Sequence, residues 1–384
     1  MKRLFGLALA GLLFLGVFSA PAAAGRDIVK VMTRNQYLGA DLEPLLLALA
    51  EGSPAVINDA ALEVLAQIEA NNFPLRAWRF ATEVALTKPH LIGLQEVIKF
   101  DITPIGQNEG STVVDHLDLT LAALDFKGQR YDEAATVNNL DITITLDTDE
   151  NQVPDLEVRV LDRDVILFRD DDDVGYPTIV DLCEDQNLDG CTYTNVVLLP
   201  NPLNPNDPIP IKRGFVGVDA TVRGKKIRFV NTHLEGAGPT DPISGRSIQS
   251  LQAEELVEKL TAANESDRPL ILLGDFNSSP EDSGDFSTPY QIIVGAGLAD
   301  IWDKNFLKFF DWNGFTCCQD KDLLNTTSLL DERIDIIFVR DTSFLPLAFV
   351  TGRVPILPLS QPPNWASDHG GVFGKLIFRR SARH

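Results

Sequence analysis

The chain has 384 residues, with 33 Lys and Arg against 55 Asp and Glu, so its formal net charge is −22 and its pI is about 4.5. Hydrophobic residues make up 44% and charged residues 23%, which matches a globular protein and excludes a mainly disordered chain. No long apolar run follows the N-terminal one, which excludes a polytopic membrane protein.

The N-terminus has the pattern of a targeting segment. Lys2 and Arg3 precede an apolar run at residues 4–18, and small residues at 22–24 offer a cleavage site. This pattern predicts a signal peptide at residues 1–24 and a secreted or periplasmic protein. A retained membrane anchor is the alternative, although the run is short for a span. A single domain is expected over residues 25–380.

From residue 27 onward, helical patterns alternate with strand patterns. Apolar spacing predicts helices at 76–87 and 247–262. Strands are predicted at 27–33, 91–94, 164–168, 213–222, 226–231, 269–273, 334–340 and 372–378, with a hairpin turn at Gly224. Mixed strands, a hairpin and covering helices predict an α+β fold in which two packed mixed sheets are flanked by helices, a four-layer sandwich.

Residues 138–212 interrupt this alternation. They contain the acidic runs 147–150 and 170–173 and a Pro/Asn-rich stretch at 200–210. We interpret them as loop insertions around the strand at 164–168, and not as a separate domain.

Four cysteines in an exported chain raise the question of disulfides. Cys183 and Cys191 flank a loop-like stretch, which predicts a local bridge between them. Cys317 and Cys318 are adjacent, and both the reduced state and crossed pairing remain open for them. Neither pair has a histidine nearby in sequence, so none of the four is expected to be catalytic.

Polar residues stand at the end of several apolar strands and at the start of others, where a scaffold presents side chains to a substrate. These residues are Asn35, Gln95, Glu96, Asn231, His233, Asp275, Asn277, Arg333, Asp335, Asp368 and His369. Each alone would be read more readily as a turn residue or a structural histidine. Together they bring carboxylate and amide oxygens, which suit Mg²⁺, Mn²⁺ or Ca²⁺ better than zinc, beside two histidines. Such a set suits phosphoester hydrolysis, in which a metal neutralises phosphate charge and side chains transfer protons.

In order and identity, these segments resemble the endonuclease/exonuclease/phosphatase superfamily, which includes deoxyribonuclease I-like nucleases, 5-phosphatases and bacterial neutral sphingomyelinases. The motifs that carry the resemblance are LIGLQEV (91–97), VNTHL (230–234), LLGDFNSSP (272–280), RIDIIF (333–338) and SDHGGVF (367–373). The resemblance extends from Asn35 to His369 and implies the deoxyribonuclease I-like form of the four-layer sandwich. Minor family-like features are Arg213-Gly214, Gln249 and Asp300. A departure is Tyr37, which stands where some relatives carry an acid; the nearest acid is Asp41.

The resemblance also implies roles for single residues. Glu96 is expected to be the principal metal ligand, with Asn35 beside it, and Asp368 a second metal or leaving-group site. Asp275 and Asn277 would position and deprotonate the attacking water or hold the phosphate.

His369 would pair with Asp335 and contact the phosphate, and His233 would stand near the leaving oxygen as a general acid. Which histidine is acid and which is base stays open, as does an alternative metal-ligand set of Asp275, Asn277 and Asp368. Asn231 and Arg213 are expected to contact substrate.

Three further patterns are weaker. Residues 185–190 have the spacing of a Ca²⁺ loop, but Val196 stands at the twelfth position and a solvated loop is the simpler interpretation. His90, His116 and His384 lack acidic neighbours in a motif and are interpreted as structural. Residues 306–312 (FLKFFDW) are predicted as a buried helix, although an exposed aromatic loop there would suit a lipid substrate.

The sequence therefore predicts a metal-dependent phosphoric ester hydrolase that uses Mg²⁺, with Mn²⁺ or Ca²⁺ as alternatives. The substrate is a phosphoester: nucleic acid, a phospholipid headgroup or a small phosphate. The acidic charge disfavours tight non-specific nucleic-acid binding, and a general phosphodiesterase is preferred over a sphingomyelinase-like one. A non-catalytic binding module is the alternative from another class. A monomer with no obligate protein partner is expected.

Overall fold

The computed structural model describes residues 27–106, 111–183, 190–201, 206, 208–263, 268–284, 286–310, 313–341, 343–355 and 362–378. The predicted signal peptide, the possible Ca²⁺ loop at 185–189 and His384 lie outside these residues. Among the helices in the described ranges, none has the length and apolar character needed to cross a membrane.

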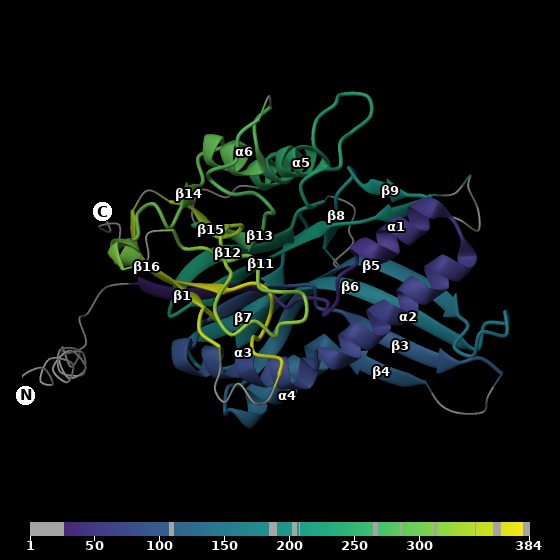
Figure 1. Ribbon diagram of the computed structural model, residues 1–384. Helices are drawn as coiled ribbons and strands as arrows, with labels where there is room; N and C mark the ends of the chain where they lie inside the picture. The colour runs from purple at the N-terminus through teal and green to yellow at the C-terminus, as the bar shows by residue number, and fades with distance from the viewer. Residues whose placement is uncertain are drawn as a thin grey trace, which may run out of the picture.

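Two mixed sheets form the centre of the molecule (Figure 1). The strands of sheet A are β1 Asp27–Asn35, β2 Leu91–Gln95, β3 Lys99–Pro104, β4 Thr112–Asp115, β5 Tyr131–Leu146, β6 Leu156–Arg169, β16 Phe344–Thr351 and β17 Gly371–Phe378. The strands of sheet B are β7 Val174–Ile179, β8 Cys191–Thr192, β11 Gly214–Val222, β12 Lys225–His233, β13 Leu270–Asp275, β14 Ala299–Asp300 and β15 Asp335–Arg340. A short pair, β9 Val197–Leu199 and β10 Ile209–Ile211, stands apart.

Sheet A has the order β16-β17-β1-β2-β6-β3-β4, with β5 paired to β6, and sheet B has the order β14-β15-β13-β12-β11-β7, with β8 paired to β11. Helices cover the outer faces: α1 Glu43–Glu51, α2 Pro54–Ala70, α3 Phe73–Thr87, α4 His116–Phe126, α5 Ile248–Ala262 and α6 Pro289–Gly295. α3 and α4 pack on sheet A, while α5 and α6 pack on sheet B. The predicted α+β four-layer sandwich is confirmed.

Strand alternation divides the apolar side chains between the layers. In β13, Ile271 and Leu273 lie in the core between the sheets, whereas Leu270 and Leu272 lie under α5 and α6. A strand with both faces buried needs such a continuous apolar run, since successive side chains point to opposite faces. Each predicted helix and strand overlaps an observed element of the same type, and the predictions at 213–222, 247–262, 269–273 and 334–340 begin one residue too early.

The segment 138–212 contains more regular structure than we predicted. β5 and β6 form a long antiparallel hairpin in sheet A, and β7 then joins sheet B. The loop interpretation of this segment is therefore wrong for most of its first half, because polar and apolar residues alternate along β5 as on a half-exposed strand. Since the segment contributes to both sheets, it is part of the same architecture.

The prediction of a buried helix at 306–312 is also wrong for its described part. Phe306–Phe309 forms a short 3-10 helix, η1, and Phe306, Phe309 and Phe310 are 68%, 71% and 82% exposed. Cys183 is bonded to Cys191 as predicted. Cys317 is bonded to Cys318, so neither alternative that the sequence left open for them, reduced thiols or crossed pairing, is correct.

Candidate active site

Strand register brings the predicted polar residues together. Asn35, the last residue of β1, lies opposite Gln95 on the parallel strand β2, which places Glu96 just beyond the same edge. In sheet B, Asp275 on β13 lies between its register partners His233 on β12 and Asp335 on β15. The carboxyl ends of the parallel strands β12 and β13 and the first residue of the antiparallel strand β15 lie at one edge of the sheet, so these side chains converge.

Asn35 links the two sheets at this edge. Its Nδ2 donates to Glu96 Oε1 at 3.1 Å and to Asp275 Oδ2 at 3.0 Å. The other carboxylate oxygen of Glu96 accepts a hydrogen bond from the Leu38 backbone N–H at 2.7 Å. Glu96 has a φ of +53°, which is sparsely populated for a residue with a side chain and persists where the surroundings enforce it.

Asp275 and Asn277 are held by a tight turn after β13. The Asn277 backbone N–H donates to Asp275 Oδ1 at 2.9 Å, and Asn277 has a φ of +47°. Gly274 has a φ of +151°, and a Cβ at this position would lie 1.9 Å from the Thr232 carbonyl oxygen. Only glycine allows β13 to approach β12 so closely where Asp275 enters the site.

His369 and Asp335 form the second hydrogen-bonded pair. His369 Nδ1 lies 2.8 Å from Asp335 Oδ2, and 3.8 Å from Asp275 Oδ2. Asp368 is also close, with Oδ1 at 3.9 Å from His369 Nε2. Burial opposes protonation of His369, but Asp335, Asp368 and Asp275 outweigh it and raise the pKa of His369 well above its usual value. Burial and the charge of Asp335 raise the pKa of Asp275 to about 7.

His233 occupies a different electrostatic environment from His369. Its Nε2 lies 3.6 Å from Asp275 Oδ2 and 3.3 Å from Asn277 Nδ2, and its Nδ1 lies 3.2 Å from Arg213 Nη1. Burial, the positive charge of Arg213 and that of His369 lower the pKa of His233 well below its usual value. A neutral His233 can accept a hydrogen bond from Arg213 at Nδ1 and carry its proton on Nε2, which faces Asp275.

Asn231 lies deeper than the other predicted site residues. It is 0% exposed, and its Nδ2 donates to the Leu94 and Val165 carbonyl oxygens at 2.8 and 3.2 Å. Its Oδ1 accepts from Gln95 Nε2 at 2.5 Å. In this structure Asn231 joins sheet B to sheet A, and its predicted contact with substrate stays a prediction.

Tyr37, the departure from the family pattern, is buried. Its hydroxyl donates to the Lys321 carbonyl oxygen at 2.9 Å. Asp41 accepts a hydrogen bond from the Glu43 backbone N–H at the start of α1. Both residues therefore have structural partners.

The donor set fits a hard divalent cation. Three buried carboxylates, from Asp275, Asp335 and Asp368, lie around His369, the histidine that favours the protonated state, and Glu96 adds a fourth carboxylate at the same edge through Asn35. One oxygen of Asp335 is buried without a hydrogen-bond partner. Excess negative charge in a buried site needs a cation, and carboxylate and amide oxygens are the ligands that Mg²⁺, Mn²⁺ and Ca²⁺ prefer.

Several supporting residues were missed by the sequence analysis. Arg76, buried on α3, donates to the Gln36 and Tyr37 carbonyl oxygens and so holds the turn after β1. Arg34 is bonded to Glu83 and to the His369 carbonyl oxygen. An arginine inside an amphipathic helix gives no sequence signal for such a role. Gln249, which we noted only as family-like, donates to the Asn277 carbonyl oxygen at 2.8 Å.

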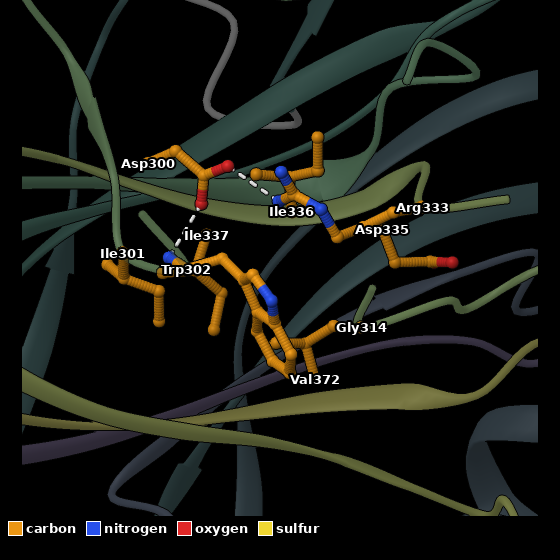
Figure 2. Close-up of a pocket in the computed structure, with 9 residues that line it drawn as sticks. All are labelled: Asp300, Ile301, Trp302, Gly314, Arg333, Asp335, Ile336, Ile337 and Val372. Carbon is orange, nitrogen blue, oxygen red and sulfur yellow. Dashed lines mark hydrogen bonds and ion pairs between the residues drawn. The ribbon is translucent and has the colours of Figure 1, made fainter. Parts of the chain in front are cut away.

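A buried ion pair lies near Asp335, just before the start of β15. Figure 2 shows a pocket lined by Trp302, Val372 and Asp335, in which Asp300 reaches Arg333. Asp300 Oδ2 lies 2.5 Å from Arg333 Nη1, and Asp300 Oδ1 accepts from the Trp302 backbone N–H at 2.8 Å. This pair fixes the start of β15, from which Asp335 extends into the site.

The fold is thus an α+β four-layer sandwich in which carboxylates, amides and histidines lie at one shared edge of the two packed sheets. The model of the Endonuclease/Exonuclease/phosphatase family matches residues 64–369, and the chain belongs to this family. No curated protein matches the chain significantly.

Solved structures with the same fold include three bacterial proteins. A family protein from Bacteroides thetaiotaomicron is 18% identical with a TM-score of 0.51, over 92% of this chain and 99% of its own. The mannosyl-6-phosphatase Bt3783 of the same species is 18% identical with a TM-score of 0.50, over 91% and 100%. A Bacteroides vulgatus family protein is 15% identical with a TM-score of 0.50, over 92% and 100%. At these identities the likeness concerns the fold.

Proposed function

We propose that the protein is a metal-dependent phosphoesterase that hydrolyses phosphodiester or phosphomonoester bonds with an activated water. The observation that carries the proposal is the convergence at Asp275. Asn35, His233 and His369 all approach its Oδ2, at 3.0, 3.6 and 3.8 Å. A carboxylate between two imidazoles and an amide can orient a water and accept its proton.

Asn35, Glu96 and Asp368 would hold the cation, with Asp275, Asn277 and Asp368 as the alternative set. A bound Mg²⁺, Mn²⁺ or Ca²⁺ would neutralise phosphate charge and polarise the phosphoryl oxygens.

The protein's own groups supply the remaining steps. Asp275 accepts a proton from water, whose oxygen forms the new bond to phosphorus as the ester bond breaks. His369, protonated and held by Asp335, is suited to bind a phosphate oxygen. His233 carries a proton on the side that faces Asp275, and either imidazole can reach the leaving oxygen of the same phosphate.

The lipid alternative is supported by one observation. Phe306, Phe309 and Phe310 are largely exposed on η1 and its end, and large exposed aromatic groups are typical of surfaces that bind a partner or a lipid. A phospholipid phosphodiesterase is therefore the second candidate. Phe309→Ser should then reduce hydrolysis of phospholipid in vesicles and spare a soluble ester.

Export to the periplasm or outside the cell is also proposed, from Lys2, Arg3 and the apolar run at residues 4–18. The form expected to be active is the monomer cut near residue 24. Fractionation of expressing cells and mass measurement of the mature chain test this part.

Turnover of bis-p-nitrophenyl phosphate tests the activity. The proposal expects hydrolysis with Mg²⁺, loss of it in EDTA, recovery when Mg²⁺ is restored, and loss in His369→Ala. Equal residual signal under all these conditions would show that the site does not hydrolyse phosphoesters. Parallel assays on plasmid DNA, sphingomyelin, phosphoinositides and sugar phosphates then identify the substrate class.

A further inference from the structure

A second group of buried acids lies on the β5–β6 hairpin, which packs against β11 of sheet B (Figure 1). Asp162 and Asp164 are two residues apart on β6, so their side chains point to the same face, toward sheet B. Asn139 on β5 lies beside them, and its side-chain amide interacts with both carboxyl groups and lowers the pKa of each, although burial outweighs this effect. The three side chains are 6%, 0% and 3% exposed.

The polar atoms of this group lack hydrogen bonds of normal geometry. Both oxygens of Asp164, Oδ1 of Asp162 and both amide atoms of Asn139 are buried without a partner. A buried carboxylate without donors is strongly disfavoured, and buried polar groups in native proteins almost always have a protein, water or ion partner. Three such side chains in one place therefore indicate a missing partner.

Arg213, the cation that contacts Asp162, is already shared with other groups. Arg213 Nη1 lies 3.5 Å from Asp162 Oδ2, and Arg213 Nη2 lies 3.8 Å from Glu235 Oε1. The same guanidinium contacts His233. When ionised, Asp162 and Asp164 carry two negative charges, and Glu235 carries a third beside Arg213. The three carboxylates therefore outnumber the single positive charge of Arg213.

We propose that Asp162, Asp164 and Asn139 bind a hard divalent cation at a site separate from the one formed by Glu96, Asn35 and Asp368. Two carboxylates and a side-chain amide oxygen are ligands of the type that Ca²⁺ and Mg²⁺ accept, with water completing the coordination. The Asn139 amide would contribute its oxygen after rotation of the amide group, whose oxygen and nitrogen ends have nearly the same shape.

A proton is the alternative partner for these carboxyl groups. The proposed cation and a proton cannot occupy Asp164 at the same time. Burial raises the pKa of Asp162 to about 6, and burial together with Asp162 raises that of Asp164 well above its usual value. The apo pair thus retains a proton that a cation displaces. Binding should therefore release protons and strengthen as pH rises.

A cation at this position would stabilise the arrangement of the β5–β6 hairpin against Arg213. It would join β5 to β6 through Asn139 and neutralise Asp164. Asp162 could then keep its remaining oxygen on Arg213, which in turn contacts His233. The site is a positioning element in this view, and its existence does not depend on the proposed function.

The test counts bound ions on the whole metal-free chain. Mn²⁺ titration followed by electron paramagnetic resonance, with Ca²⁺ competition, gives the number of equivalents in wild type, Asp164→Asn and Glu96→Gln. The expected result is the loss of one equivalent in Asp164→Asn and the retention of the second-site ion in Glu96→Gln. Asp141→Asn is the matched control, because Asp141 is an exposed acid on β5 that is paired with Arg159, and it should bind as wild type does.

A measurement on wild type and Glu96→Gln covers the case in which Asp164→Asn does not fold. Ca²⁺ should raise the melting temperature of metal-free Glu96→Gln, with proton release during the titration. The inference is overturned when Asp164→Asn binds as many ions as wild type, or when Glu96→Gln binds none and shows no thermal shift. Bound-ion counts stand whether or not the protein hydrolyses phosphoesters, so the two proposals fail separately.

Discussion

The space between the two sheets has two regions of opposite chemistry, although the same strands build both. In the middle, the inter-sheet core consists of apolar side chains such as Val31, Leu91, Phe229, Ile271 and Ile337. A few residues further along β1, β2, β12 and β13, polar side chains take their place. They belong to the strand-end site, which consists of Asn35, Glu96, His233, Asp275, Asn277, Asp335, Asp368 and His369.

The difference shows how stability and function are divided along each strand. Burial of apolar surface in the core contributes about 25 cal/mol per Å². The strand-end site instead buries carboxylates and imidazoles, which costs free energy unless a partner is present. The core therefore maintains the geometry of a site that does not stabilise itself.

The largest expected effect separates the regions by activity. Asp275→Asn removes the carboxylate that three other site residues approach, and should lower kcat by roughly 10²- to 10⁴-fold. Its unfolding free energy should stay the same or rise, since one buried charge is lost. Steady-state kinetics and urea unfolding measure both, and Asp125→Asn, an exposed substitution on α4, is the control. A parallel loss of stability and activity would contradict the division.

A substitution in the apolar core should instead change stability. Phe229→Ala removes a fully buried ring between the sheets and should reduce the unfolding free energy by about 3–5 kcal/mol. Phe306→Ala, at an exposed phenylalanine, should change it by less than about 0.5 kcal/mol. Similar midpoints for the two variants in urea would show that the inter-sheet layer does not carry the stability.

The two regions also differ in how far the sequence predicts them. Core strands such as 269–273 are visible as apolar runs, and strand-end motifs locate Glu96, Asp275 and His369. β5 was not predicted, because many of its residues are polar and we interpreted the acidic and polar stretch from residue 138 onward as loops. The supporting contacts of Arg34 and Arg76 join segments far apart in the chain, and no local pattern encodes them.

Asn231 lies at the boundary between the regions and sharpens the comparison. Asn231→Leu leaves the Leu94 and Val165 carbonyl oxygens and Gln95 without their partner, and should cost about 1–3 kcal/mol of unfolding free energy. Thermal and urea unfolding measure this change. Unchanged stability with a raised KM would instead assign Asn231 to substrate binding, as the sequence analysis predicted.

The smallest expected effect concerns His90, a polar residue at the far end of the sheet. Burial lowers the pKa of His90 to about 4, and its Nδ1 accepts a hydrogen bond from the Lys30 backbone N–H at 2.9 Å. The unfolded chain binds a proton near pH 6.5, before the folded state does, so stability falls as pH decreases from about 6.5 toward 4. His90→Asn keeps an acceptor without titrating. Between pH 7 and pH 5, the unfolding free energy of His90→Asn should therefore fall by roughly 2 kcal/mol less than that of wild type. Urea unfolding at both pH values measures the difference, and equal losses would contradict a neutral buried His90.

The central claim is that side chains far apart in sequence act as one hydrolytic unit, and a double-mutant cycle of Glu96→Gln and His369→Ala tests it most directly. With bis-p-nitrophenyl phosphate and Mg²⁺, each single variant should lose most of the turnover. The turnover of the double variant should equal that of the less active single variant, because the effects of residues that act together are not additive. Losses that multiply in the double variant, or a wild type without turnover, would contradict the account.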